Sequence, residues 1–484
     1  MENLTLLTDL YQLTMLYGYH QSGTGRKRAV FTMFYRDAPG LHYAVMAGNE
    51  QFREYVLNLA FTEADIAYLR SLRLFGEPFL ESLRAFRFTG DVRAVPEGTI
   101  VFPGEPLVRV DAPLEEAQLV ETALLNIVGH QTLVATKANR VVRAAGGDRV
   151  LEFGLRRAQG PDAGVFGSRA AYIGGCGFTS NVKAGQVFGI PVAGTHAHSW
   201  VMSFDSELEA FRAYARCFPD SCLLLVDTYD TLGSGVPNAI TVFKELKEQG
   251  HRPLGIRLDS GDLAYLSIRA RAMLDAAGLE EAVITASNDL DEFLIRDLKQ
   301  QGAKISVWGV GTRLITGMDR PSLGGVYKMS ALERDGVMEP KIKLSDNPAK
   351  VTLPGAQELY RIYTPDGKAA ADLIALADEE VREDVPLTLF DPQDTWKRMT
   401  LTEFTAKRLL QPLVIGGNAA GPSPARTDIR ARRAREEASV WEQHLRLVNP
   451  SVFKVDWTQR LWDLRRDMLH GIREGAGPAP GGQA

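Results

Sequence analysis

The middle of this 484-residue chain repeats one unit, in which a short apolar run leads to a polar or glycine-rich end and then to a helical pattern. Near-continuous apolar strands that alternate with helices predict a parallel sheet covered on both faces. The apolar runs lie at residues 150–153, 223–226, 254–258, 283–286 and 305–308. Just after them come Arg156, Asp227, Asp259, Asn288 and Gly311. Because an α/β barrel carries its active site at this edge, we expect the chemistry of the protein there.

The segments on either side of this region have mixed helical and strand patterns. Before it, helical spacing occurs at residues 4–23, 49–58, 62–72 and 114–145, and strand patterns occur at 29–35 and within 88–110. Thr62, with Asp65 three residues later, is typical of a capped helix start. After it, short strands recur from about residue 339, residues 426–435 predict an exposed helix, and the tail at 475–484 is predicted to be disordered.

Composition and charge exclude several classes of protein. The formal net charge is -5, whereas nucleic-acid-binding proteins usually carry a basic excess. The cysteines Cys176, Cys217 and Cys222 form no CxxC pair, and we expect them in a reducing compartment. The chain starts without a basic region and an apolar run, and no stretch approaches the roughly 20 apolar residues of a membrane span. We therefore expect a cytoplasmic enzyme that binds neither nucleic acid nor membrane.

Two histidines are candidates for chemistry. The chain has no GxxxxGK[ST] motif, no HExxH motif and no Cys–His cluster with zinc spacing, so candidate groups come from strand ends. His196 and His198 follow a short apolar segment at residues 190–193. Either ring suits a base, a nucleophile or a phosphate acceptor. The alternative for either is a hydrogen-bonded structural histidine, and spacing does not choose between them.

Charged residues leave two further strands. Asp227 and Asp230 are placed to orient a histidine ring by accepting its N–H, or to cap the helix that follows. Arg257 lies inside an apolar run, where an unpaired cation would cost roughly several kcal/mol. Its partner is therefore an internal carboxylate or the anionic group of a ligand.

The remaining strand ends favour a phosphorylated sugar. Residues 309–312 form a glycine-rich turn before a helix, which presents free backbone N–H groups to a phosphate, and residues 287–289 would flank it. Asp259, Ser260 and Asp262 suit ribose hydroxyls or a metal-bound phosphate. A histidine, a carboxylate, an arginine and a phosphate nest on one rim indicate a phosphorylated sugar that meets a second anion.

Six ordered blocks of the chain also resemble one family. They are Leu7-Thr8-Asp9-Leu10-Tyr11-Gln12, Glu152-Phe153-Gly154-x-Arg156-Arg157, Gly194-Thr195-x-Ala197-His198-Ser199, Val226-Asp227-Thr228-Tyr229-Asp230, Arg257-Leu258-Asp259-Ser260-Gly261-Asp262 and Gly324-Gly325-Val326-Tyr327-Lys328. On these blocks the chain resembles the nicotinate phosphoribosyltransferase family from near residue 4 to about residue 450.

The resemblance implies an α/β fold in which an irregular, incomplete (β/α) barrel packs on an α/β sandwich domain built from N- and C-terminal segments. Residues 1–145 would form the N-terminal part of the sandwich, with helical segments, and residues 146–335 the barrel-like catalytic domain. Residues 336–450 would return to the sandwich, and residues 451–484 would be a C-terminal extension with a disordered tail. The family also implies a homodimer with shared active sites.

The reaction implied by the resemblance is the formation of nicotinate mononucleotide, a step of NAD biosynthesis that salvages nicotinate. The substrates are nicotinate and 5-phosphoribosyl 1-pyrophosphate (PRPP), with Mg²⁺ as cofactor. ATP is a co-substrate, and its hydrolysis is coupled through a transient phosphohistidine. No residue is assigned as a direct Mg²⁺ ligand.

Roles carry over residue by residue. His198 matches the phosphorylated histidine, and Asp227 matches the carboxylate that orients it. The nicotinate site is implied to consist of Phe153, Thr195, Arg257 and, from the partner subunit, Tyr11. Contacts to the phosphorylated substrate are implied for Arg156, Gly311, Thr312, Lys341 and Lys343, and strand-end position adds Asp259, Ser260 and Asn288. His196 sits where members of the family vary, and it receives no role.

Other functions fit the sequence less well. In nicotinamide phosphoribosyltransferase a carboxylate follows the Gly-Thr pair, whereas His196 stands there in this chain, which favours an anionic ring. Quinolinate phosphoribosyltransferases are shorter and lack the block around His198. A barrel aldolase would need a Schiff-base lysine at a strand end, and none of the five apolar runs ends in lysine. A non-catalytic binding protein is the remaining alternative.

Overall fold

The computed structural model describes residues 3–37, 40–347 and 350–475. The chain forms two compact units, one made of Met1–Thr132 with Ser322–Ala484 and the other of Leu133–Pro321. The sequence placed the corresponding boundaries near residues 145 and 335. The C-terminal tail predicted to be disordered lies outside the described residues, apart from Gly475 at the end of the last helix.

A parallel sheet of six strands forms the centre of the second unit. Its order is β7-β6-β11-β10-β9-β8, with bounds Phe178–Thr179, Arg149–Glu152, Val307–Val310, Val283–Ala286, Gly255–Leu258 and Leu223–Leu225. Each strand pairs with its neighbours in parallel, so all the strands end at one edge. The predicted α/β class with an incomplete barrel is confirmed.

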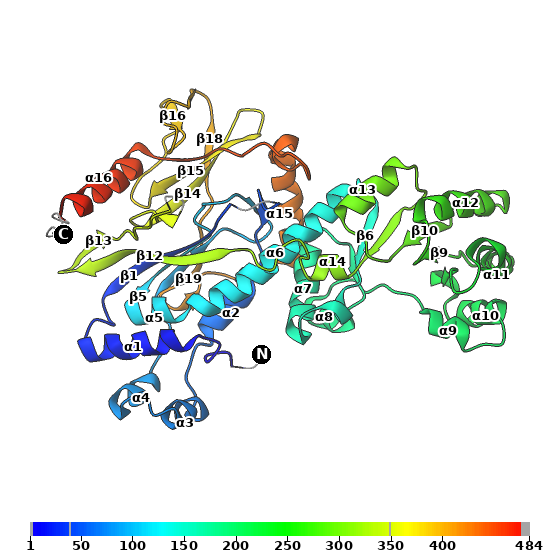
Figure 1. Cartoon of the computed structure of the whole chain (residues 1–484), viewed down its shortest axis with the longest axis horizontal. Helices are drawn as coiled ribbons and strands as arrows, with labels where there is room; N and C mark the ends of the chain where they lie inside the picture. The colour runs from blue at the N-terminus through cyan, green and yellow to red at the C-terminus, as the bar shows by residue number, and fades with distance from the viewer. Residues whose placement is uncertain (1–2, 38–39, 348–349, 476–484) are drawn as a thin grey trace, which may run out of the picture. The chain divides into compact units, whose positions relative to one another are not determined.

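Helices alternate with these strands, and Figure 1 shows α11, α12 and α13 beside β9 and β10. The helical segments of this unit are η1 Leu155–Arg157, α7 Pro161–Gly174, α8 Val182–Phe188, α9 His198–Met202, α10 Glu207–Cys217, η2 Pro219–Ser221, η3 Thr231–Gly235, α11 Val236–Glu248, α12 Leu263–Ala276, α13 Glu292–Gln300 and α14 Thr312–Ile315. The strand expected at 305–308 lies two residues later and continues through Gly309. The strand expected at 190–193 is a single bridge between Val192 and Thr179.

Both ends of the chain build the first unit, as the sandwich prediction requires. Its seven-stranded sheet has the order β13-β12-β1-β5-β3-β19-β20, with bounds Val337–Pro340, Gly325–Arg334, Arg28–Tyr35, Val108–Pro113, Asp91–Ala94, Gln411–Ile415 and Asn418–Ala419. A four-stranded sheet contains β18 Thr405–Arg408, β14 Gln357–Tyr363, β15 Ala369–Leu376 and β21 Val455–Trp457. Two short sheets pair β16 Leu387–Phe390 with β17 Arg398–Leu401 and β2 Ala44–Val45 with β4 Ile100–Val101.

The helices of this unit mostly follow the predicted spacing. They are α1 Leu10–Ser22, α2 Asn49–Leu57, α3 Glu63–Ser71, α4 Glu77–Leu83, α5 Leu114–Leu119, α15 Arg426–Ser439 and α16 Gln459–Gly475, and α6 Glu121–Ala145 begins here. Thr62 and Asp65 form the expected capping box of α3. The helix predicted at 4–23 begins only at Leu10, and the turn before it is tied to Ala60, because the hydroxyl of Thr5 donates to the carbonyl of Ala60 and accepts from its amide, each at 3.0 Å. The segment predicted as an extension contributes β21, which pairs with β15.

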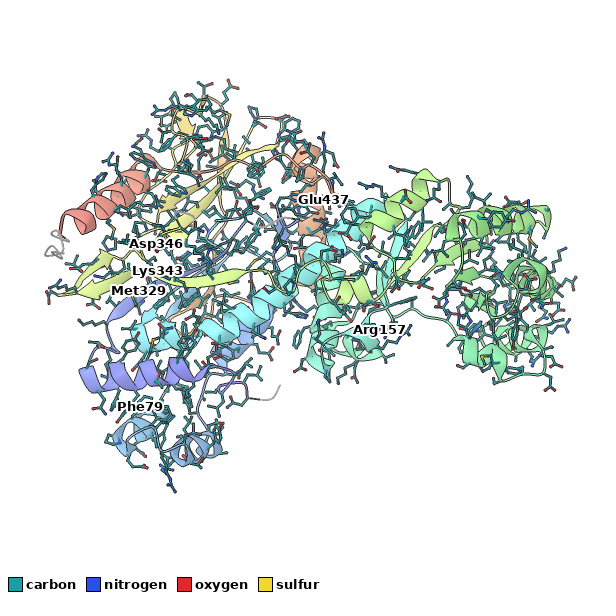
Figure 2. The ribbon with its side chains drawn as sticks, in the orientation of Figure 1. Phe79, Arg157, Met329, Lys343, Asp346 and Glu437 are labelled. Atoms are coloured by element: carbon teal, nitrogen blue, oxygen red, sulfur yellow. The ribbon has the colours of Figure 1, made fainter. Side chains whose placement is uncertain are left out.

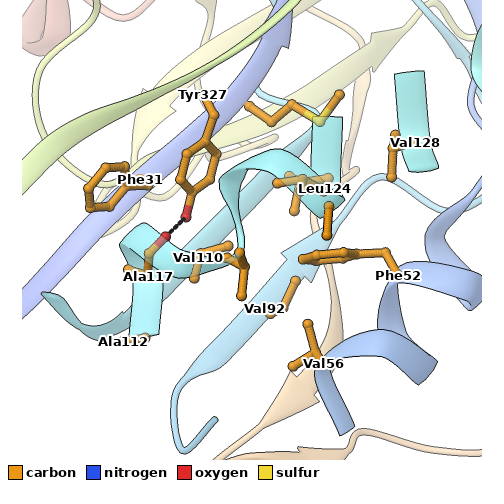
Figure 3. Close-up of a cluster of buried hydrophobic side chains, with 14 of the residues drawn as sticks. Phe31, Phe52, Val56, Val92, Val110, Ala112, Ala117, Leu124, Val128 and Tyr327 are labelled. Atoms are coloured by element: carbon orange, nitrogen blue, oxygen red, sulfur yellow. Dashed lines mark hydrogen bonds between the residues drawn. The ribbon is translucent and has the colours of Figure 1, made fainter. Parts of the chain in front are cut away.

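An aromatic pair joins the N-terminal and C-terminal segments of the chain in the core of the first unit. Phe31 of β1 stacks on Tyr327 of β12 with ring centroids 4.9 Å apart. The buried hydroxyl of Tyr327 donates to the carbonyl of Ala117 at 2.8 Å, as Figure 3 shows. Because a buried hydroxyl without a partner is destabilising, this bond fixes β12 against α5.

Candidate active site

The edge at which the parallel strands end opens into a cavity of about 500 Å³. Residues that the sequence predicted as site residues line it: Phe153, Arg156, Thr195, His198, Arg257, Asp259, Asn288, Gly311 and Thr312. They lie at the ends of β6, β11, β10 and β9 and on the segment 194–198. Since neighbouring strands are about 4.8 Å apart, these groups spread across the sheet edge from β6 to β9.

The ring of Phe153 lies against the glycine of the neighbouring strand. A Cβ atom at Gly309 would stand 2.7 Å from two ring carbons of Phe153, which is closer than contact allows. The preceding Glu152 is fully buried, and its carboxylate accepts from the hydroxyl of Ser168 at 2.8 Å and from the amide of Gly154. This carboxylate therefore fixes the turn that carries Phe153.

Cationic and N–H donor groups gather at the β6–β11 end of the cavity. Arg156 and Arg157, the latter labelled in Figure 2, lie on the 3-10 turn η1 and are exposed. Within the described residues neither guanidinium has an ion-pair partner, and both line the cavity. Gly311 and Thr312 start α14, and the first amides of a helix have no intrahelical acceptor. This end of the cavity suits a phosphate.

Asn288 adopts a strained backbone conformation at the same rim. Its φ is 93°, in the left-handed region that few residues other than glycine occupy. Its side-chain oxygen accepts from the amide of Asp289 at 3.1 Å, which helps to stabilise the turn. Such strain persists where surrounding structure enforces it, and it clusters at functional sites.

The guanidinium of Arg257 lies in the middle of the cavity edge with few partners. Its side chain is 12% exposed, and Nη1 is 3.8 Å from Asp259 Oδ1. Nη2 donates to the carbonyl of His196 at 2.8 Å, and Nη1 contacts Ser287 Oγ at 3.4 Å. Nε is buried and has no hydrogen-bond partner among the described residues. Burial lowers the pKa of Arg257, and Asp259 opposes that shift.

The partner of His198 differs from the expected one. The sequence assigned Asp227 to orient the ring, but His198 Nδ1 lies 3.1 Å from the hydroxyl of Thr228. His198 Nε2 is 3.7 Å from Asp259 Oδ2. Asp227 Oδ2 instead accepts from the amide of Asp259 at 2.9 Å and from the hydroxyl of Ser260 at 2.6 Å. Asp227 thus stabilises the loop after β9, because its Oδ2 accepts hydrogen bonds from that loop and not from the ring of His198.

The role of His196, which the sequence left open, is visible in its contacts. The residue is 8% exposed, and burial lowers its pKa to about 4, so the ring is neutral near pH 7. His196 Nε2 accepts the amide N–H of Leu225 at 3.2 Å, and Nδ1 lies 3.3 Å from the carbonyl of Ala197. Its ring therefore supports the fold of the rim.

Three predicted site residues belong to the first unit. Tyr11 on α1 is 48% exposed. Lys341 Nζ donates to Glu339 at 2.8 Å, and Lys343, labelled in Figure 2, is exposed. Their roles in binding stay predictions.

Sequence reasoning missed two residues that organise the site. Thr228 was quoted only as part of a motif, and Glu152 only as the residue before Phe153. The available signal for Thr228 was a hydroxyl directly after Asp227 at a strand end. The signal for Glu152 was a carboxylate inside an apolar run.

No helix in the described part of the chain is both long and apolar enough to cross a membrane.

Comparisons with known proteins agree across nearly the whole chain. Family models described as the nicotinate phosphoribosyltransferase N-terminal domain, family and C-terminal domain match residues 6–129, 149–365 and 356–465. Nicotinate phosphoribosyltransferase of Bacillus subtilis is 47% identical over 474 residues, which cover 98% of this chain and 96% of that protein. The human protein of that name is 36% identical over 524 residues, which cover 96% and 97%.

A solved structure gives the same result for the fold. The crystal structure of human nicotinic acid phosphoribosyltransferase matches with a TM-score of 0.83 at 33% identity, and the match covers 96% of this chain and 99% of that one. Identity of this extent over the full length, together with the matching fold, places the chain in one family. The chain belongs to the nicotinate phosphoribosyltransferase family.

Proposed function

We propose that this protein is a nicotinate phosphoribosyltransferase, which joins nicotinate to the ribose of PRPP and releases pyrophosphate. The observation that carries the proposal is one cavity in which an aromatic ring, a buried guanidinium and the amides at a helix start meet. These groups belong to Phe153, Arg257, Gly311 and Thr312. The 47% identity to the Bacillus subtilis relative of that name supports the same activity.

The flat ring of nicotinate fits the wall formed by Phe153, because aromatic rings stack in offset geometry. The carboxylate of nicotinate would then face Arg257, whose Nε–H has no acceptor among the described residues and needs one. Tyr11 of a second copy would cover the other face of the ring, in a homodimer with shared sites. The exposure of the Tyr11 side chain, 48%, supports such a contact.

The ribosyl donor fits the other end of the cavity. Its 5′-phosphate would bind the amides of Gly311 and Thr312 beside Arg156, and its hydroxyls would bind Asp259 and Ser260. The ring nitrogen of nicotinate forms the new C–N bond, and pyrophosphate leaves with the electron pair of the broken C–O bond. Lys341 and Lys343 are proposed contacts of pyrophosphate. Catalysis is mainly the positioning of two bound substrates and stabilisation of the leaving anion.

Magnesium fits this site as an ion carried with pyrophosphate. Among the described residues, no three His, Cys, Asp or Glu side chains gather as a metal site. Mg²⁺ usually binds one or two carboxylates together with substrate phosphates, and Asp259 and Asp289 line the cavity. When bound, the ion would neutralise charge on the pyrophosphate.

His198 is the proposed acceptor of phosphate from ATP. Nδ1 is held by Thr228, so Nε2 is the nitrogen left to take the γ-phosphoryl group, with release of ADP. Water later cleaves the N–P bond. The phosphate would add a charge of about −1.5 to −2, by analogy with phosphate on other side chains. We infer that this charge organises the pyrophosphate site through Mg²⁺ and basic residues.

Product analysis tests the reaction. The protein is mixed with PRPP, Mg²⁺ and either nicotinate or nicotinamide, with and without ATP, and the nucleotides are separated. We expect nicotinate mononucleotide, more of it with ATP, and little product from nicotinamide. Absence of nicotinate mononucleotide under all conditions would refute the proposed activity, and a preference for nicotinamide would support the closest alternative.

The variant His198→Ala tests the coupling. It should abolish ATP-dependent stimulation and leave slow turnover without ATP. His251→Ala is the matched control, because His251 pairs with Asp220 at the surface of the same unit and should retain stimulation. Equal stimulation of His198→Ala and the parent would refute the phosphohistidine.

A further inference from the structure

The strand β8 is the edge strand of the parallel sheet, and in the described part of the chain β9 is the only strand that pairs with it. The two residues that flank β8 bond to β9. The amide of Gly255 donates to the carbonyl of Cys222 at 3.3 Å, and the amide of Val226 donates to the carbonyl of Arg257 at 3.2 Å. Because main-chain groups alternate along a strand, the outward groups belong to Leu223 and Leu225. Both residues are buried, so these groups need partners other than water.

Two consecutive side chains supply those partners. The hydroxyl of Thr195 donates to the carbonyl of Leu223. The amide of Leu225 donates to His196 Nε2 at 3.2 Å. Thr195 and His196 thus occupy the hydrogen-bonding positions of a seventh strand, and they attach the segment 194–198 to the sheet.

We propose that His196 is a positioning residue for the reaction: by accepting the Leu225 amide it fixes the segment 194–198 on β8, and through its own carbonyl it holds Arg257. Nη2 of Arg257 donates to that carbonyl at 2.8 Å, and His198 follows two residues later. The proposal rests on the proposed function, in which Arg257 binds the nicotinate carboxylate. A displaced His196 would therefore move the group that recognises nicotinate.

The ring of His196 is suited to be a permanent acceptor. With Nδ1 facing the carbonyl of Ala197 at 3.3 Å, the proton belongs on Nδ1 and the lone pair on Nε2. Burial keeps the ring neutral by lowering its pKa to about 4. The ring packs edge-on to Tyr214 at 4.8 Å and near Phe211 at 6.2 Å. A phenylalanine would fit these aromatic neighbours but would offer no acceptor.

The position of β8 in the sheet gives the proposal a specific signature. The amides of Gly311 and Thr312 follow β11, and β10 and β9 lie between β11 and β8. Loss of the His196 bond should therefore disturb the nicotinate end of the cavity and leave the phosphate end in place. A general loss of stability would lower the amount of folded enzyme without raising the KM for one substrate alone.

Two substitutions separate packing from hydrogen bonding. In assays without ATP, in which His198 carries no phosphate, His196→Phe should raise the KM for nicotinate about tenfold, the size of one lost hydrogen bond, while the KM for PRPP stays near that of the parent. His196→Gln places an amide oxygen near the position of Nε2 and should restore the parent KM. A His196→Phe enzyme with parent values for both substrates, or a His196→Gln enzyme as impaired as His196→Phe, would overturn the proposal.

Hydrogen–deuterium exchange tests the bond without the reaction. In the parent, the Leu225 amide should exchange as slowly as amides of β9, although it lies in the edge strand of the sheet. The amide should exchange faster in His196→Phe and return to parent protection in His196→Gln. Rapid exchange of Leu225 in the parent would overturn the proposal even if the variants fail to fold. If the parent makes no nucleotide but its Leu225 amide exchanges slowly, the proposed function is refuted, whereas the hydrogen bond between Leu225 and His196 is supported.

Discussion

Two arginines with little exposed surface, one in each compact unit, have opposite surroundings. Arg361 on β14 is fully buried, and its Nε and Nη2 donate to the two oxygens of Asp372 at 2.8 and 2.6 Å. Nη1 donates to Glu436 at 2.7 Å, and Nη2 also donates to the carbonyl of Ile100 at 2.8 Å. Each of the three side-chain nitrogens of Arg361 thus donates to the protein itself.

The side chain of Arg257 is 12% exposed and has no such enclosure. Its nearest carboxylate atom, in Asp259, is 3.8 Å away, and its Nε has no hydrogen-bond partner in the described part of the chain. Burial lowers the pKa of Arg257, whereas in Arg361 the effect of burial is outweighed by Asp372 and then Glu436, which raise the pKa. The difference teaches that a fully paired arginine stabilises the fold, while one left with free donors in an open cavity suits an anionic ligand.

The comparison predicts its largest effect for Arg361→Leu. This change leaves Asp372 and Glu436 buried without their cation, and breaking a buried pair in this way costs about 3–5 kcal/mol of unfolding free energy. Urea unfolding followed by tryptophan fluorescence measures it. Arg257→Leu is the matched control, and an equal loss of stability in both variants would contradict the distinction.

Arg257→Leu should instead lose activity. Removal of a poorly paired buried cation should leave the melting temperature near that of the parent, because little internal bonding is lost. The kcat/KM for nicotinate should fall about 100-fold, equivalent to ~2.7 kcal/mol, since a charged hydrogen-bond partner of the carboxylate is gone. Steady-state kinetics at saturating PRPP measures this.

Arg257→Lys sharpens the result. It retains the charge but not the fork of two parallel donors, so it should recover only part of the lost kcat/KM. Full recovery would mean that charge alone recognises the substrate, and parent kinetics in Arg257→Leu would remove Arg257 from the site.

The sequence predicted Arg257 but not Arg361, and the reason is physical. Arg257 stands inside one of the repeated apolar runs, so its cost of burial was visible along the chain. Arg361 lies in a strand of mixed residues, Gln357–Tyr363, and its partners Asp372 and Glu436 lie 11 and 75 residues further on. Local patterns carry no information about such distant pairing.

The same limit applies within the site. The alternation of apolar runs and helices predicted the parallel sheet and the edge at which Arg156, Asp259 and Gly311 meet. Neither it nor the resemblance, which implied that Asp227 orients His198, predicted that His198 pairs with Thr228 while Asp227 binds Ser260. Which of two neighbouring polar groups binds a ring depends on shifts of about 1 Å, which the periodicity of a strand does not determine.

The smallest predicted effect concerns a third carboxyl group near Arg361. Glu105 is fully buried, and its pKa is raised well above the ordinary value by burial and then by Asp372. The folded protein therefore keeps a proton on Glu105 that the unfolded chain releases above about pH 4.5, so stability falls as the pH rises through that range.

Glu105→Gln cannot ionise and should escape this loss. We expect equal unfolding free energies for parent and variant near pH 4.5 and a variant that is the more stable of the two at pH 8. Glu54→Gln on the exposed side of α2 is the control and should shift stability equally at both pH values. A Glu105→Gln variant whose stability difference from the parent does not change with pH would show that Glu105 is ionised beside Asp372, and that Arg361 balances three carboxylates instead of two.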